Sequence, residues 1–107
     1  MSGLRSRRRG ARGEVEVVHQ LHALGFPQAR RNFGSGSQGG GDITGVPGIH
    51  LEVKYQEALN TWAALAQACE EAGKNVPVVA FRRNRSEWYA ALPVDELASL
   101  LALRHAA

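Results

Sequence analysis

The chain has 107 residues, of which 44% are hydrophobic and 21% are charged, the size and composition of one globular domain. No apolar run approaches the roughly 18–20 residues of a membrane-spanning helix, and the basic N-terminus lacks the apolar segment of a secretory signal. We therefore expect a cytoplasmic protein that does not bind membranes. Cys69 is the only cysteine, which excludes an intramolecular disulfide and indicates a small buried thiol.

Positive charge gathers at the N-terminus. Residues 1–12 carry five arginines, whereas residues 13–107 carry 8 Lys+Arg against 10 Asp+Glu, a net charge of −2. We interpret the first segment as a flexible basic arm and the second as a single folded domain. Basic arms favour polyanions, most often nucleic acid, because binding releases counterions. A tail that only improves solubility would carry the same charge, so the arm indicates a partner but no chemistry.

The first half of the chain predicts a helix followed by three strands. A helix is expected over residues 13–25, because Val17, Val18, Leu21 and Leu24 form an apolar stripe at helical spacing. The strands are expected over residues 28–32, 42–46 and 49–55.

Glycine and proline predict the connections between these strands. Residues 33–41 contain five glycines and two serines, which is typical of a mobile loop. Pro47-Gly48 is typical of the turn of a β-hairpin. In the second strand of that hairpin, apolar residues alternate with His50, Glu52 and Lys54, so one face carries every ionisable group.

The second half predicts a helix over residues 58–72, a β-branched strand over 76–82, a strand over 87–92 and a helix over 94–103. The first of these helices is expected to turn five residues inward: Leu59, Trp62, Leu65, Ala66 and Cys69. The order α-β-β-β-α-β-β-α contains a strand–helix–strand crossover. It therefore predicts an α/β fold, with a mixed sheet of about five strands flanked by helices.

Three charged residues of the hairpin give the strongest functional signal. Asp42 opens one strand, and Glu52 and Lys54 lie two positions apart on the other, so their side chains point to the same face. Neighbouring carboxylates repel unless a hard cation such as Mg²⁺ lies between them, and a lysine beside it can orient a water or take up a proton. Together these groups suit hydrolysis of a phosphodiester. A solvated Glu–Lys pair on a strand face is the alternative interpretation.

Glu14 adds a further carboxylate. It lies on the apolar stripe of the first predicted helix, whereas Glu16 falls on the outer side. A lone carboxylate directed at the core is unfavourable unless a cation or a donor meets it, so we assign Glu14 to the same metal site. A favourable place in the first helical turn is the alternative. We interpret His50 as an exposed strand histidine in preference to a ligand of substrate or metal.

From about Gly13 to Leu97 the sequence resembles the PD-(D/E)XK nuclease superfamily, and within it the archaeal-type Holliday junction resolvases. Its shortness suggests a compact version, such as a phage would encode. The resemblance rests on these features: Glu14, a helix ending Leu-Gly-Phe26, Arg30, the Gly/Ser loop, Gly-Asp42-Ile, Leu-Glu52-Val-Lys54, and Pro77-Val-Val-Ala-Phe81.

The resemblance implies a restriction-endonuclease-like fold and a homodimer that nicks two strands of a four-way DNA junction symmetrically. It implies that Asp42 and Glu52 bind Mg²⁺, for which Mn²⁺ would substitute. Lys54 would support the attacking water, Glu14 would assist the metal site, and we expect no small-molecule cofactor.

A loop serine, either Ser35 or Ser37, would also take part in catalysis according to the resemblance. Contacts to DNA phosphates are expected from seven arginines, which belong to the basic arm, to the strand after the first helix, and to the turn that follows residue 81. They are Arg8, Arg9, Arg12, Arg30, Arg31, Arg82 and Arg83.

Two other functions fit the same residues. The first is a PD-(D/E)XK nuclease that acts on flaps, ends or duplex DNA, because substrate choice depends on dimer geometry and DNA shape and not on the catalytic residues. The second is a non-catalytic DNA-binding module in which the carboxylates are structural.

Overall fold

The computed structural model describes residues 2–33 and 41–106. Its elements are α1 (Ser2–Ala23), β1 (Arg30–Arg31), β2 (Ile43–Thr44), β3 (Ile49–Tyr55), α2 (Thr61–Glu71), β4 (Val76–Arg82), β5 (Tyr89–Ala91) and α3 (Val94–Ala106). The predicted α/β class and the predicted order of elements are confirmed. No helix within the described ranges is long and apolar enough to cross a membrane.

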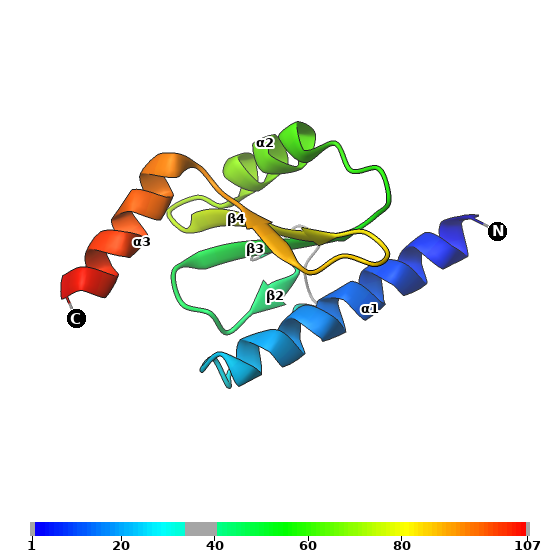
Figure 1. The fold of residues 1–107 in the computed structure, drawn as a ribbon, viewed down its shortest axis with the longest axis horizontal. Coiled ribbons are helices and arrows are strands. Elements are labelled where there is room, and N and C mark those ends of the chain that lie inside the picture. The colour runs from blue at the N-terminus through cyan, green and yellow to red at the C-terminus, as the bar shows by residue number, and fades with distance from the viewer. Residues whose placement is uncertain (1, 34–40, 107) are drawn as a thin grey trace.

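The strands form one mixed sheet in the order β1-β2-β3-β4-β5. β3 and β4 are parallel, with Glu52 beside Val79, and the other neighbouring strands are antiparallel. A parallel pair needs a long crossover, which α2 supplies. Figure 1 shows the sheet between α1 and α2, with α3 extending away from one end. This arrangement is the restriction-endonuclease-like fold that was expected.

The face of the sheet that packs on α1 holds the larger core. Leu51 and Val53 of β3 pack there with Val17 and Val18 of α1. Side chains alternate between the two faces of a strand. The ionisable residues of β3 at positions 50, 52 and 54 therefore face α2.

The face that packs on α2 has a core of small residues. Ala64 and Ala68 are buried there against Val79 of β4. The predicted inward face of this helix is therefore wrong in part, since Ala66 and Cys69 are exposed and Trp62 is 85% exposed. Small side chains let the helix approach the sheet closely, a possibility that counting large apolar residues overlooks.

The first helix begins at Ser2 and not near Gly13 as predicted, so the segment expected to be a flexible arm is helical from residue 2. Gly13 marks a close contact instead of a helix start. A Cβ atom on Gly13 would lie 3.1 Å from the Trp88 ring and 3.2 Å from the Cβ of Tyr55. The absence of a side chain therefore lets α1 continue past β3 at short range.

Candidate active site

Asp42 is fixed between Gly41 and β2. Its N–H donates to the carbonyl of Leu51 at 2.8 Å, and its carbonyl accepts from the N–H of Asn32 at 2.9 Å. Its Oδ2 accepts a hydrogen bond from the N–H of Val53 at 2.7 Å. Since Val53 separates Glu52 from Lys54, these bonds hold the Asp42 carboxylate beside that pair, as the hairpin predicts.

Gly41 makes this placement possible. Its φ is +73°, and a Cβ atom there would lie 2.6 Å from the carbonyl oxygen of Leu51. An L-residue with a side chain would be strained by both the dihedral angle and the contact. The last glycine of the Gly/Ser segment is therefore part of the structure that positions Asp42.

Glu52 is a buried carboxylate close to a second one. It is 7% exposed, and its Oε1 lies 2.8 Å from Nε2 of His50. Burial and the charge of Asp42 raise the pKa of Glu52 from 4.5 to about 7, although the hydrogen bond with His50 acts in the opposite direction. The carboxylates of Asp42 and Glu52 form an oxygen donor set that fits a hard divalent cation, because the cation would relieve their repulsion.

Lys54 and Glu14 share a pocket with Asp42. The pocket has a volume of about 570 Å³, and all three residues line it. Besides the hydrogen bond from Gln67, the charge of Lys54 contributes to lowering the pKa of Glu71, whereas Oε1 of Glu14 lies 2.9 Å from Nε of Arg31. The structure thus brings Asp42, Lys54 and Glu14 to one pocket, and Glu52 interacts with Asp42 beside it.

Two residues that the sequence did not assign adjoin Glu52. His50 is 1% exposed, contrary to the interpretation as an exposed histidine, and Glu71 ends α2. Ligand atoms of His50, Glu52 and Glu71 lie within 4.8 Å of one another. A sequence signal for Glu71 exists, since it lies three and seven residues after Ala68 and Ala64 and so shares the face of α2 that meets the sheet.

Two arginines of α1 line the site. Arg5 and Arg9 line the pocket of Asp42 and Lys54, and Arg9 also lies over the Tyr55 ring, 5.2 Å from its centroid. The pocket therefore combines carboxylates that suit a cation with arginines that suit phosphate.

The other arginines assigned to DNA differ in exposure and partners. Arg8, Arg30 and Arg83 are exposed, whereas Arg31 is half-buried and paired with Glu14. Ser35 and Ser37, assigned to catalysis, lie outside the described residues.

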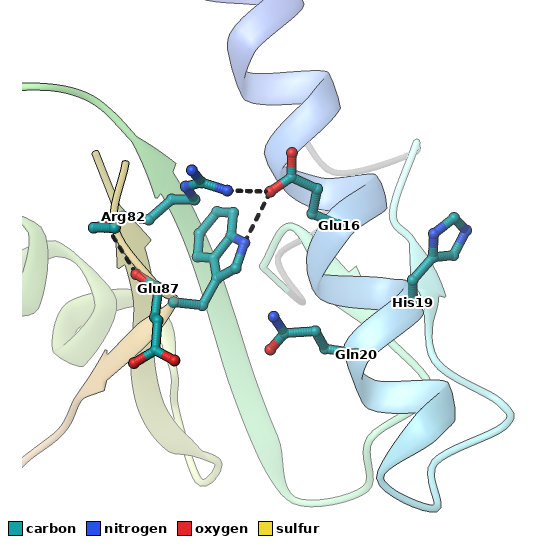
Figure 2. Close-up of a pocket in the computed structure, with 7 residues that line it drawn as sticks. Glu16, His19, Gln20, Arg82 and Glu87 are labelled. Carbon is teal, nitrogen blue, oxygen red and sulfur yellow. Dashed lines mark hydrogen bonds and ion pairs between the residues drawn. The ribbon is translucent and has the colours of Figure 1, made fainter. Parts of the chain in front are cut away.

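A second pocket joins α1 to the end of β4 (Figure 2). There, Oε1 of Glu16 accepts hydrogen bonds from Nη1 of Arg82 at 2.9 Å and from Nε1 of Trp88 at 3.0 Å. Glu16 therefore does not lie on an outward helical face as predicted. Burial raises its pKa, but the bonds from Trp88, Arg12 and Arg82 outweigh that effect and lower it below its usual value. These contacts anchor α1, and they leave Arg82 engaged within the protein.

The comparisons with known proteins bear on this site directly. The model of a family described as "Phage putative PDDEXK endonuclease" matches residues 5–106, a range that includes every described residue of the site. A search of curated proteins and a search of solved structures each gave no significant match. The site combines the buried Glu52, the half-buried Asp42, a lysine and a basic helix, and the family match spans nearly the whole chain. The chain therefore belongs to this phage PD-(D/E)XK endonuclease family.

Proposed function

We propose that the protein is a Mg²⁺-dependent endonuclease that resolves four-way DNA junctions, nicking two strands symmetrically as a homodimer. The observation that carries the proposal is the convergence of Asp42, Glu52 and Lys54 beside a pocket that is also lined by Arg5 and Arg9. This arrangement supplies ligands for a cation, a lysine and phosphate-binding groups within one site.

Asp42 and Glu52 are the residues that would hold the cation. Burial and the charge of Asp42 raise the pKa of Glu52 to about 7, and a divalent cation would relieve this unfavourable ionisation. A bound Mg²⁺ would supply positive charge to stabilise the phosphate during reaction, and Mn²⁺ would substitute for it. The backbone bond from Val53 keeps the Asp42 carboxylate oriented before any ligand arrives.

Lys54 is the residue that we assign to orienting the attacking water and stabilising negative charge. Lys54 lines the pocket, and its ammonium group would orient a water for attack on phosphorus and stabilise the negative charge that develops on the phosphate. The attacking water would form a new P–O bond and give up its proton to bulk water, while the bond to the leaving sugar oxygen would break and that oxygen would take up a proton from solvent. No covalent bond to the enzyme forms in this scheme. Glu14 lies in the same pocket and supports the site while paired with Arg31.

The four-way junction and the dimer are supported by the sequence resemblance and by the size of the chain. One domain of 107 residues offers little surface for reading a specific DNA sequence. Recognition of DNA shape by two copies needs less surface on each, because the fixed geometry of the dimer selects the angle between DNA arms. Basic residues on α1 would contact the phosphates next to the cut.

Cleavage of matched substrates tests this proposal. A labelled four-way junction, a flap and the corresponding duplex are incubated with the same enzyme concentration, with Mg²⁺ or with EDTA. We expect paired, symmetric nicks in the junction that need Mg²⁺, and much slower cutting of the duplex. Equal cleavage of flap or duplex would assign the enzyme to another substrate, and binding without Mg²⁺-dependent nicking would contradict the catalytic proposal.

A further inference from the structure

A group of nitrogen and oxygen ligands lies on the α2 side of Glu52. Nε2 of His50 lies 2.8 Å from Oε1 of Glu52 and 3.9 Å from Oε2 of Glu71. The imidazole is almost completely buried, with 1% of its side chain exposed, so its nitrogen is directed at two carboxylates inside the protein and not at solvent. Three different side chains therefore converge on one point.

Separate elements bring these ligands together. His50 and Glu52 are two positions apart on β3 and share the face that packs on α2. Glu71 is the last residue of α2, and its Oε1 accepts a hydrogen bond from Nε2 of Gln67 at 3.1 Å. That bond orients the carboxylate so that the other oxygen, Oε2, is the one nearest to His50.

We propose that His50, Glu52 and Glu71 form a second cation site, which adjoins the Asp42–Glu52 site, shares Glu52 with it, and takes a first-row transition-metal dication. Two ligand atoms of a tetrahedral ion with bonds of about 2.0 Å lie roughly 3.3 Å apart. The distances from Nε2 of His50 to Glu52, 2.8 Å, and to Glu71, 3.9 Å, lie on either side of that value. A small adjustment of Glu71, whose side chain is 47% exposed, is sufficient to bring the three ligands to one ion.

The chemistry of the ligands separates this site from the first. Mg²⁺ prefers oxygen ligands and keeps several waters, whereas an imidazole nitrogen suits transition-metal dications such as Zn²⁺, Fe²⁺ and Ni²⁺, for which Mn²⁺ serves as the paramagnetic probe. The exposed side chain of Glu71 provides a path for the ion from solvent, and the buried imidazole excludes water from the opposite side. The first cation site, which this site adjoins, rests on the proposed function. Ion binding by His50 and Glu71 can be measured without any DNA cleavage.

Calorimetric titration of the full-length chain with MnCl₂ or MgCl₂ tests the second site. Because Mn²⁺ would also occupy the Asp42–Glu52 site, Glu71→Gln and its control are made in the Asp42→Asn protein. There, Glu71→Gln should lower Mn²⁺ affinity by roughly tenfold to hundredfold, the range found even for residues that only support metal ligands. Its Mg²⁺ affinity should change much less. Glu70→Gln is the matched control, since Glu70 is exposed on the same helix and belongs to no ligand group that the structure describes. Asp42→Asn should retain Mn²⁺ binding.

A spectroscopic measurement identifies the nitrogen ligand independently. Electron spin echo modulation of bound Mn²⁺ should show coupling to ¹⁴N in the wild type and in Asp42→Asn, and none in His50→Gln. Equal Mn²⁺ affinities of Glu71→Gln and Glu70→Gln, or a wild-type Mn²⁺ spectrum without ¹⁴N coupling, would overturn the proposal. If His50→Gln fails to fold, the Mn²⁺ affinity of Glu71→Gln and the wild-type Mn²⁺ spectrum still test the proposal, because the side chain of Glu71 is exposed. These tests do not use DNA. A failed junction assay would therefore count against the proposed nuclease function and not against Mn²⁺ binding by His50, Glu52 and Glu71.

Discussion

Glu52 determines the electrostatics of the site at the scale of single residues. Its carboxylate is buried near Asp42, and His50 offsets only part of the resulting rise in its pKa. In the metal-free protein the ionised form is therefore disfavoured relative to the unfolded chain. The stability of the metal-free protein should consequently depend on pH through this residue.

The variant Glu52→Gln tests that dependence. The pKa of Glu52 is raised from 4.5 to about 7, so its destabilising effect is complete above pH 7, declines as pH falls toward 4.5, and is absent below. In EDTA at pH 8, Glu52→Gln should unfold with a free energy higher by on the order of 2–3 kcal/mol. At pH 4.5 the difference should nearly vanish.

Urea denaturation of both proteins in EDTA from pH 4.5 to 8 measures this difference. Comparing wild type with variant cancels the titration of the groups that do not interact with Glu52. A difference that stays constant over this pH range would contradict the raised pKa of Glu52.

The hairpin pattern predicts Asp42, Glu52 and Lys54 because strand alternation alone places Glu52 and Lys54 on one face. The sequence could not give the burial of His50, since alternation shows which residues share a face but not whether a helix covers it. Glu71 shares the face of α2 that carries Ala64 and Ala68, but an acidic residue at a helix end usually faces solvent, so this spacing alone does not indicate a ligand. The proximity of His50 and Glu71 to Glu52 follows only when α2 is placed on β3.

At the scale of elements, α2 shows why helical phase is difficult to predict. Leu59 and Leu65 pack against the small core as expected, but Ala64 and Ala68 form its buried centre while Trp62 remains exposed. A rule that turns the largest apolar residues inward fails where a helix must lie close to a sheet, because bulky side chains would hold the two apart. The same principle explains Gly13 within α1.

The anchor of α1 yields a stability prediction. Glu16→Ala removes the carboxylate that accepts hydrogen bonds from Arg82 and Trp88, and it leaves the Arg82 guanidinium without that partner. We expect the free energy of unfolding to fall by about 1–3 kcal/mol, as measured by urea denaturation at pH 7. Glu87→Ala is the matched control, because Glu87 lines the same pocket with an exposed side chain (Figure 2) and should change stability by less than about 0.5 kcal/mol. Equal stability of the two variants would argue against the anchor.

Two arginines of α1 lead to a prediction about DNA binding. Arg5 and Arg9 line the pocket of Asp42, so replacing both by alanine should weaken junction binding and lower the slope of log K against log salt by about 2. Fluorescence anisotropy at several salt concentrations measures this slope. Arg104→Ala, near the end of α3, is the control and should leave it nearly unchanged. A double variant with the wild-type slope would show that these arginines do not contact phosphate.

At the scale of the whole molecule, the α/β class and the order of elements followed from the sequence. Periodicity of 2 or 3.6 residues and the Gly/Pro turns separate the strands from the helices, and the strand 76–82 was predicted with its observed bounds. The helical state of residues 2–12 was not predicted, because a run of arginines without an apolar stripe resembles a tail. The DNA substrate is not encoded in the catalytic residues, since substrate choice depends on DNA shape and on protein surface outside them.

The central claim is that Asp42, Glu52 and Lys54 carry out metal-dependent cleavage of a phosphodiester. Its most direct test is single-turnover nicking of a labelled four-way junction with Mg²⁺ by Asp42→Ala, Glu52→Ala and Lys54→Ala, with binding to the same DNA measured in parallel. We expect each variant to bind the junction nearly as well as the wild type, and its nicking rate to fall by roughly 10²-fold to 10⁴-fold or more. Wild-type nicking by any one of these variants would contradict the assignment of the site.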